Sequence, residues 1–323
     1  MSNAVVNINE SEVLIGIQNF MISMCFEGDS EKGFKEGLVQ LIPQFKVIYQ
    51  SNLQYAQSIE TFHSLTKVVD HILNGQAISA VKHLDSMQIT QLLGLLRQGR
   101  LFIAQEIIYL KAQEKRNQRS LREYLKQLTQ HYAKLLFIRI DLSIELKYQH
   151  QVGIEQFHVY LRTFINRMQN QDTCFKDLHG YAWALEQGES KAYHCHVLLI
   201  YDGHKHQKDF GMAIQVGQCW SEITANQGYY FTSNSPEYKA QFLQKGKLGI
   251  GMIHRSNPQQ VENAINAAMY LVNPEKENQY LRAGVPKMRS FGKAQYKTDH
   301  RRGCDVSALP VAQVFRLCTD YYD

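Results

Sequence analysis

A nearly unbroken apolar run, from Ala192 to Tyr201, begins with the pair His194 and His196. Successive side chains of a β-strand point to opposite faces, so the two imidazoles share one face and Cys195 points to the other. The residues that follow are apolar on both faces, which is typical of a central strand covered on both sides. A buried imidazole needs a hydrogen-bond or metal partner. The run therefore predicts a covered sheet with two neighbouring histidines, either as structural residues or as ligands of one metal ion.

Composition sets the outer limits of the prediction. At 323 residues the chain is longer than most single domains, which favours two domains with separate cores. The net charge of +5 is compatible with a polyanionic partner but does not require one. The six cysteines are scattered and no apolar leader follows the amino terminus, so we expect a protein of the reducing cytoplasm without a disulfide framework. The longest apolar runs are shorter than a membrane span, and we expect no membrane partner.

The character of the chain changes near residue 135. Upstream, residues 53–73 and 89–128 carry apolar side chains at helical spacing with few turn signals. We expect residues 1–130 to form a helical domain. Its last helix has a basic surface, which could lie along phosphates or be a solvated helix face. The basic residues of this helix are Lys111, Lys115, Arg116, Arg119, Arg122 and Lys126.

Downstream of this helix, strands and helices alternate. The patterns predict strands at residues 135–142, 180–187, 192–201 and 248–254 and helices at 153–168, 212–223 and 257–272. The turn at residues 188–190 joins the second and third strands into an antiparallel hairpin. The order β-α-β-β-α-β, with one extra helix, is that of a ferredoxin-like domain, in which the first and third strands are central. We therefore predict an α+β protein with a helical N-terminal domain, a domain with a central antiparallel sheet at 131–300, and a C-terminal tail at 301–323.

Glu186, just before the hairpin turn, is a candidate third ligand beside the histidines. Its carboxylate can approach His194 and His196 across the ladder if all three side chains point to the same face. Two nitrogens and one oxygen form an open ligand set that suits Mg²⁺ or Mn²⁺ held partly by substrate oxygens, whereas a closed tetrahedral set would suggest structural zinc. A surface glutamate is the alternative, because strand register cannot be read from the sequence.

The helix expected at residues 257–272 offers a nucleophile for a metal-polarised phosphate. Its apolar stripe would pack on the sheet, and the helical neighbours of Tyr270 are small or polar, which leaves the tyrosine hydroxyl accessible. A tyrosine can form a covalent intermediate, and a nearby cation or metal favours its phenolate. Tyr280 is the alternative nucleophile.

The segment after this helix is rich in cations, with aromatic residues between them. Such a composition can follow a single DNA strand by charge and by base stacking. A solvated tail is the alternative. We predict DNA contacts from Arg282, Lys287, Arg289 and Lys293.

Four of these features occur together: the strand 137–141, the hairpin with Glu186 and the His-x-His pair, the tyrosine helix, and the segment 289–293. In this combination they resemble the HUH replication initiators, specifically the inovirus (filamentous-phage) replication proteins and the YagK/YfjJ C-terminal domain group. The resemblance covers residues 131–296. It implies that residues 131–300 form a ferredoxin-like HUH endonuclease domain.

The resemblance implies a rolling-circle replication initiator of a phage or other mobile genetic element. Such an enzyme is a single-strand DNA endonuclease that nicks and joins DNA at a replication origin. His194, His196 and Glu186 would bind the divalent ion. Tyr270 would attack the scissile phosphate, leaving a 5′-phosphotyrosine and a free 3′-hydroxyl, and Arg139 would contact DNA. Positioning and electrostatics would supply most of the catalysis.

The chain departs from the family pattern just after the expected nucleophile. Many such initiators carry a lysine three residues later, where this chain has Asn273, followed by Pro274 and Lys276. Either the helix ends at the proline, so that Lys276 turns back to act in catalysis, or that role is absent.

Two other functions stay open. The first is a DNA-binding regulator that keeps the fold without catalysis, and the second is a metal-dependent hydrolase of another phosphoester. The chain has no Gly-x-x-x-x-Gly-Lys-Ser/Thr phosphate loop of a helicase. An initiator of this kind would therefore need a host helicase and a host polymerase as partners.

Overall fold

The computed structural model describes residues 8–28, 30–272 and 279–296. The first part of the chain is helical, as predicted, apart from the two-residue strand β1 (Gln54–Tyr55). Its helices are α1 (Glu10–Ile22), α2 (Glu31–Ile48), α3 (Gln57–Leu73) and α4 (Ser86–His131). The segments predicted to be helical at residues 53–73 and 89–128 correspond to α3 and α4.

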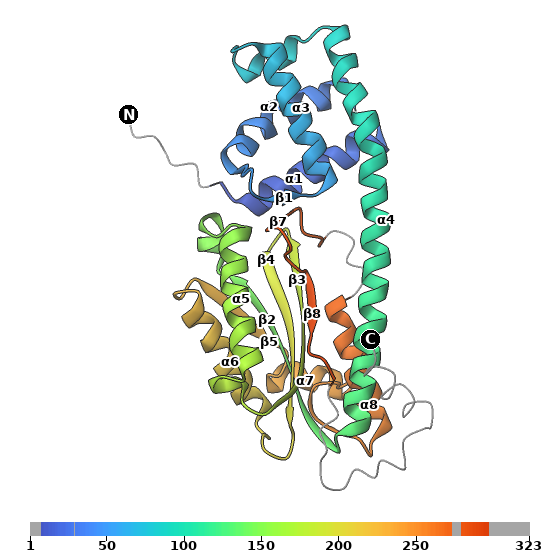
Figure 1. The fold of residues 1–323 in the computed structure, drawn as a ribbon, viewed down its shortest axis with the longest axis vertical. Coiled ribbons are helices and arrows are strands. Elements are labelled where there is room, and N and C mark those ends of the chain that lie inside the picture. Colours follow the sequence, from blue (N-terminus) through green and yellow to red (C-terminus); the bar gives the residue numbers. More distant parts are fainter. Residues whose placement is uncertain (1–7, 29, 273–278, 297–323) are drawn as a thin grey trace, which may run out of the picture.

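The helix α4 is one uninterrupted element of 46 residues. It begins with a capping box, in which Asp85 and Gln88 each accept a hydrogen bond from the other's backbone N–H. It ends at His131, next to the predicted domain boundary, but its side chains belong to both parts of the molecule. Figure 1 shows α4 running beside the N-terminal helices and then beside the sheet.

The second part of the chain is a sheet with helices on both faces. Its strands are β2 (Lys134–Ile144), β3 (Leu178–Gly188), β4 (Ala192–Asp202), β5 (Gly228–Thr232), β6 (Gly251–His254) and β8 (Phe291–Lys293). Its helices are α5 (Ile154–Asn170), α6 (Asp209–Ile223), α7 (Pro236–Leu243) and α8 (Pro258–Met269). The short strand β7 (Ala283–Gly284) pairs with β1 of the N-terminal part. The strands and helices predicted for this half are all present, and the α+β class is confirmed.

The strands of the main sheet are antiparallel, in the order β5-β2-β4-β3-β8, with β6 also paired to β2. The strands predicted to be central, β2 and β4, lie inside the sheet. Every residue of β4 is buried, as expected for a strand covered on both faces.

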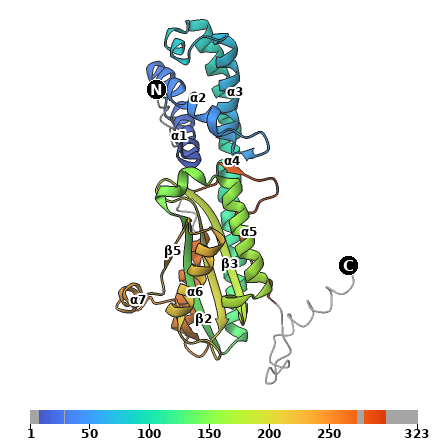
Figure 2. The same ribbon diagram turned by 90° about the vertical axis from the view of Figure 1, so that its left-hand side faces the viewer.

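Four elements of this part were not predicted. They are β5, α7, β7 and β8, at residues 228–232, 236–243, 283–284 and 291–293. The first two lie in a stretch of Gly, Ser and Asn whose composition is typical of a loop. Figure 2 shows that α7 stands away from the body of the sheet. None of the helices among the described residues is both long and apolar enough for a bilayer crossing.

Each face of the sheet has its own core. The helices α5 and α6 cover one face, where Cys195 and Val197 lie in the same cluster as Trp220. The C-terminal half of α4 and the helix α8 cover the other face, through residues such as Leu125 and Ile265. Because neighbours in a strand point to opposite faces, the two histidines of β4 face α4 and α8. Cys195 thus points away from them, as predicted.

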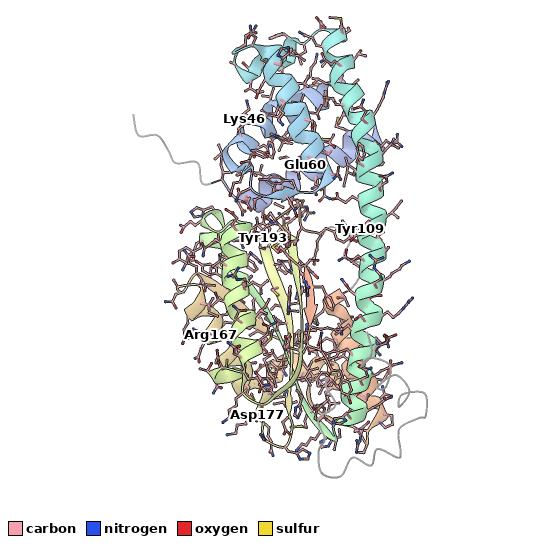
Figure 3. All side chains as sticks on the ribbon, in the orientation of Figure 1. Lys46, Glu60, Tyr109, Arg167, Asp177 and Tyr193 are labelled. Carbon is pink, nitrogen blue, oxygen red and sulfur yellow. The ribbon has the colours of Figure 1, made fainter. Side chains whose placement is uncertain are left out.

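The N-terminal helices rest on the end of the sheet that carries the β3–β4 turn (Figure 1). Glu10 of α1 accepts hydrogen bonds from the Tyr193 hydroxyl at 2.7 Å and from the Ile154 N–H at 2.8 Å. Figure 3 labels Tyr193 at this junction. Burial raises the pKa of Glu10, and this effect exceeds the opposite effect of the two hydrogen bonds.

Replacing Glu10 with Gln should favour the folded state more at high pH than at low pH. Because the pKa of Glu10 is raised in the folded protein, the contribution of this group to stability falls as the pH rises through that pKa. Glutamine keeps an acceptor oxygen for Tyr193 and Ile154 but has no titrating proton. Urea unfolding at about pH 5 and about pH 8 should therefore show a relative gain for Glu10→Gln at the higher pH.

The matched control for this experiment is Glu12→Gln, which changes an exposed carboxylate of the same helix. The gain of Glu10→Gln at the higher pH should exceed any gain of Glu12→Gln. Equal effects of the two substitutions would contradict the role assigned to the buried carboxyl group.

Candidate metal centre

The register of the β3–β4 hairpin places Glu186 directly opposite His194. His196 lies opposite Ala184 of β3 and opposite Asp141 of β2. Directly opposed residues share a face of the sheet, so the carboxylate and both imidazoles lie together on the side of α4 and α8. The prediction that Glu186 approaches the histidine pair is confirmed.

Both imidazoles direct Nε2 toward the same carboxylate oxygen. Glu186 Oε2 lies 3.5 Å from Nε2 of His194 and 3.2 Å from Nε2 of His196. One ligand atom from each of the three residues lies within 4.8 Å of the others. The histidines are buried, and the Glu186 side chain is 12% exposed. This ligand cluster of Glu186, His194 and His196 could hold a metal ion and leave coordination positions open for other ligands.

The other nitrogen of each ring has a protein partner. Nδ1 of His196 lies 2.6 Å from Asp141 Oδ1, and Nδ1 of His194 lies 3.1 Å from the carbonyl oxygen of Ala192. When a metal ion is bound, Nδ1–H of each ring would donate to these oxygens and Nε2 would offer its lone pair to the ion. Asp141 was not predicted to orient a ligand, because its contact depends on the register between β2 and β4.

The carboxylates also change the protonation of the cluster. Burial would lower the pKa of His196, but its hydrogen bonds to Asp141 and Glu186 raise that pKa above its ordinary value. Burial would raise the pKa of Asp141, but His196, Arg139 and Lys191 together lower it. The cluster thus offers nitrogen and carboxylate oxygen ligands, a donor set that suits a divalent cation.

Tyr270 immediately follows α8, on the side of the sheet that carries the ligand cluster. It is 55% exposed, and the guanidinium carbon of Arg139 lies 5.7 Å from the centre of its ring. Arg139 lies on the same face of β2 as Asp141, whose pKa it helps to lower. Its Nε is buried without a hydrogen-bond partner in the described part of the chain. Arg139 is therefore close both to the orienting carboxylate and to Tyr270.

A cavity of about 290 Å³ lies between α4, β3 and residues 279–291. Glu186 lines this cavity, so the ligand cluster borders it. Tyr280 lines it as well, and its hydroxyl donates a hydrogen bond to Glu114 of α4 at 2.9 Å. Tyr270 is not among the lining residues. The two candidate nucleophiles thus differ in their surroundings. Tyr270 is exposed beside Arg139, whereas the Tyr280 hydroxyl is hydrogen-bonded to the Glu114 carboxylate.

The cations predicted to contact DNA have different environments. Lys287 and Arg289 are exposed, between β7 and β8. Lys293 of β8 holds its ammonium group 4.8 Å from the centre of the Tyr124 ring, and burial lowers its pKa. Lys276, the predicted catalytic lysine, lies outside the described residues.

Arg282 is buried, with an exposed fraction of 2%. Its guanidinium donates hydrogen bonds to the carbonyl oxygens of Gln187 at 3.0 Å and Tyr280 at 2.7 Å, and to the side chain of Gln18. Burial lowers its pKa to about 10, so the side chain stays charged at neutral pH. A DNA phosphate could reach this group only if these bonds opened. We therefore assign Arg282 a structural role in place of the predicted DNA contact.

Residues 99–294 match the family model described as the YagK/YfjJ C-terminal domain, which covers more than half of the chain. The chain belongs to the YagK/YfjJ C-terminal domain family. The region matched to this family begins inside α4 and ends just after β8, so it includes the sheet, the ligand cluster and Tyr270. It also includes the part of α4 that packs on the sheet. Comparisons with curated proteins and with solved structures gave no match.

Removing a ligand should weaken metal binding. Either His194→Ala or Glu186→Gln should lower the affinity for Mn²⁺ at least ~10-fold, because each deletes one of three ligand atoms. Asp141→Asn should lower it about 10- to 100-fold by removing the carboxylate that orients His196. Isothermal titration calorimetry on the full chain measures these affinities.

His204→Ala is the control for these variants. This exposed histidine follows β4 and lies outside the ligand cluster. The variant should bind Mn²⁺ as the unmodified protein does. Unchanged affinity in both ligand variants would rule out the site.

Proposed function

We propose that the protein is a metal-dependent endonuclease that nicks and joins single-stranded DNA through a 5′-phosphotyrosine intermediate. In this proposal it initiates rolling-circle replication of a phage or other mobile genetic element. The observation that supports it best is the cluster of Glu186, His194 and His196 on the sheet face that α8 and its following Tyr270 also occupy. A bound Mg²⁺ or Mn²⁺ would neutralise the charge that develops on the scissile phosphate.

The arrangement of the sheet supports the same proposal. A ferredoxin-like HUH domain requires the histidine strand to be central and antiparallel to its neighbours, which are the properties of β4. The glutamate comes from the preceding strand of the hairpin, and the tyrosine comes from a later helix on the same face. We propose that this sheet and the helices that cover it form a domain of this type.

In the proposed reaction the Tyr270 oxygen attacks the scissile phosphorus. A bond forms between this oxygen and phosphorus, the bond from phosphorus to the 3′-oxygen breaks, and the tyrosine proton is transferred to the departing 3′-oxygen. Attack by a 3′-hydroxyl on the phosphotyrosine would reverse these steps and join the strand. Arg139, whose guanidinium carbon lies 5.7 Å from the centre of the Tyr270 ring, would supply positive charge next to the reacting phosphate.

A DNA-binding regulator without catalysis is the second candidate function. It is favoured by Asn273, which occupies the position where many such initiators carry a lysine. The exposed Lys287 and Arg289 would serve DNA binding in either case. In the first case host proteins, a helicase and a polymerase, would unwind and copy the DNA, because the chain has no helicase phosphate loop.

Tyr270→Phe should abolish the covalent adduct between protein and DNA. The assay incubates the protein with Mn²⁺ and labelled single-stranded DNA from the region flanking its own gene, then denatures the sample. Tyr280→Phe is the control and should keep the adduct. If Tyr280→Phe abolished the adduct and Tyr270→Phe kept it, Tyr280 would be the nucleophile. Binding without cleavage would indicate the regulator, and cleavage without an adduct would indicate a hydrolase.

Arg139→Gln should slow adduct formation at least ~10-fold, because the scissile phosphate loses a nearby positive charge. Its affinity for Mn²⁺ should stay within about threefold, since Arg139 is not a ligand. Arg139→Lys, which keeps the charge, should recover part of the rate. The control Arg162→Gln changes an exposed arginine of α5 on the opposite face. A rate that is unchanged in Arg139→Gln would refute this role.

A further inference from the structure

The outer side of α4 carries cations that the proposed active site does not use. On its inner side, Leu121, Leu125 and Leu128 pack against the sheet and α8. Helical spacing puts Lys115 and Arg119 on the opposite side, where both are exposed. The basic face of α4 consists of Lys111, Lys115, Arg116, Arg119, Arg122 and Lys126.

Few carboxylates balance this basic face. Arg122 lies 3.7 Å from Glu262 of α8. Lys115, Arg119 and Lys126 have no ion pair with any carboxylate in the described ranges. The acidic side chains of this stretch are Glu123, which is exposed, and Glu114, which accepts the hydrogen bond from Tyr280 in the cavity on the inner side. The outer side is therefore a row of positive charge.

The basic face forms a straight row of cations along α4, and the length of this row is fixed by the helix. At about 1.5 Å per helical residue, its cations extend over roughly 22 Å. One turn of duplex DNA is about 34 Å long, so the row can follow one phosphate strand for part of a turn. Just above it, the exposed Tyr109 lies 5.7 Å from the guanidinium carbon of Arg116; Figure 3 labels Tyr109 on α4. This contact holds Arg116 against the helix surface.

We propose that the basic face of α4 binds the phosphate backbone of duplex DNA next to the single strand that is nicked. The reference to a nicked strand rests on the function proposed above. A single strand bound along this face would be expected to stack its bases on exposed aromatic rings. Between residues 111 and 126 the aromatic residue is Tyr124, which is buried against the sheet. The exposed ring of Tyr109 lies beyond one end of the row, beside Arg116. A row of cations with a single ring at its end favours a duplex, whose bases stay paired and whose phosphates are regularly spaced.

The test compares two triple variants of the full chain with equal changes in charge. The face variant carries Lys115→Glu, Arg119→Glu and Lys126→Glu. The control variant carries Lys32→Glu, Lys67→Glu and Lys82→Glu, at exposed lysines of the N-terminal part. Fluorescence anisotropy measures binding to a labelled duplex of about 20 base pairs in EDTA, from about 50 to about 200 mM salt. Thermal unfolding shows that each variant is folded.

We expect the unmodified protein and the control variant to bind the duplex with similar salt dependence. The face variant should bind at least ~10-fold more weakly, and its slope of log K against log salt should fall by about 2.7, or 0.9 for each lost phosphate contact. An equal loss in the control variant would attribute binding to net charge and overturn the proposal. It would also be overturned by unchanged binding in the face variant or by no duplex binding in the unmodified protein.

A second measurement separates this proposal from the proposed endonuclease function. Adduct formation on short single-stranded DNA should stay within about twofold in the face variant, because its changes lie on the outer side of α4. If the unmodified protein forms no adduct, the endonuclease function fails, but the duplex measurement still decides whether the basic face binds DNA. If the face variant lost adduct formation to the same extent as duplex binding, the basic face would bind the single strand. That result would overturn its assignment to the duplex.

Discussion

The antiparallel register of β3 and β4 is the constraint on which the candidate site depends. It sets Glu186 opposite His194, and a slip of one residue would turn the carboxylate to the side of α5 and α6. Burial opposes such a slip, because β4 is covered on both faces and each of its residues has a fixed environment. If β4 turned over, the two histidines would enter the apolar core around Trp220 without partners, at a cost of roughly 2–7 kcal/mol each.

A second layer of contacts turns three nearby side chains into an ordered ligand cluster. Asp141 and the carbonyl group of Ala192 hold the outer nitrogens of the two imidazoles, whose planes stand 85° apart. The Nε2 atoms of both rings then point at Glu186. Arg139 helps to lower the pKa of Asp141, and its guanidinium also lies beside the Tyr270 ring. The same strand, β2, thus supplies the group that orients a histidine and the cation beside the proposed nucleophile.

The helix α4 joins the two parts of the molecule physically. Its first half packs with α3 and with residues 23–27, and its second half packs on the sheet face that carries the ligand cluster. Buried polar groups complete the junction, because Glu10 and Arg282 each bind donors or acceptors from the other part. A buried charge is tolerated when such partners satisfy it. The matched family region begins inside α4, which agrees with a helix that is integral to the sheet domain.

The sequence by itself determined the longer helices and strands of the sheet domain and the shared face of the histidine pair, because helical and strand periodicities are local properties of the chain. His194 and His196 lie side by side whatever strand pairs with β4. Only the tertiary structure decided that Asp141 orients His196 and that Arg282 is buried, because both depend on contacts between segments far apart in the sequence. The same holds for β8, whose three residues form a strand because they can pair with the edge of β3. Local pattern fixes which face a side chain takes, whereas its partner is fixed by register and packing.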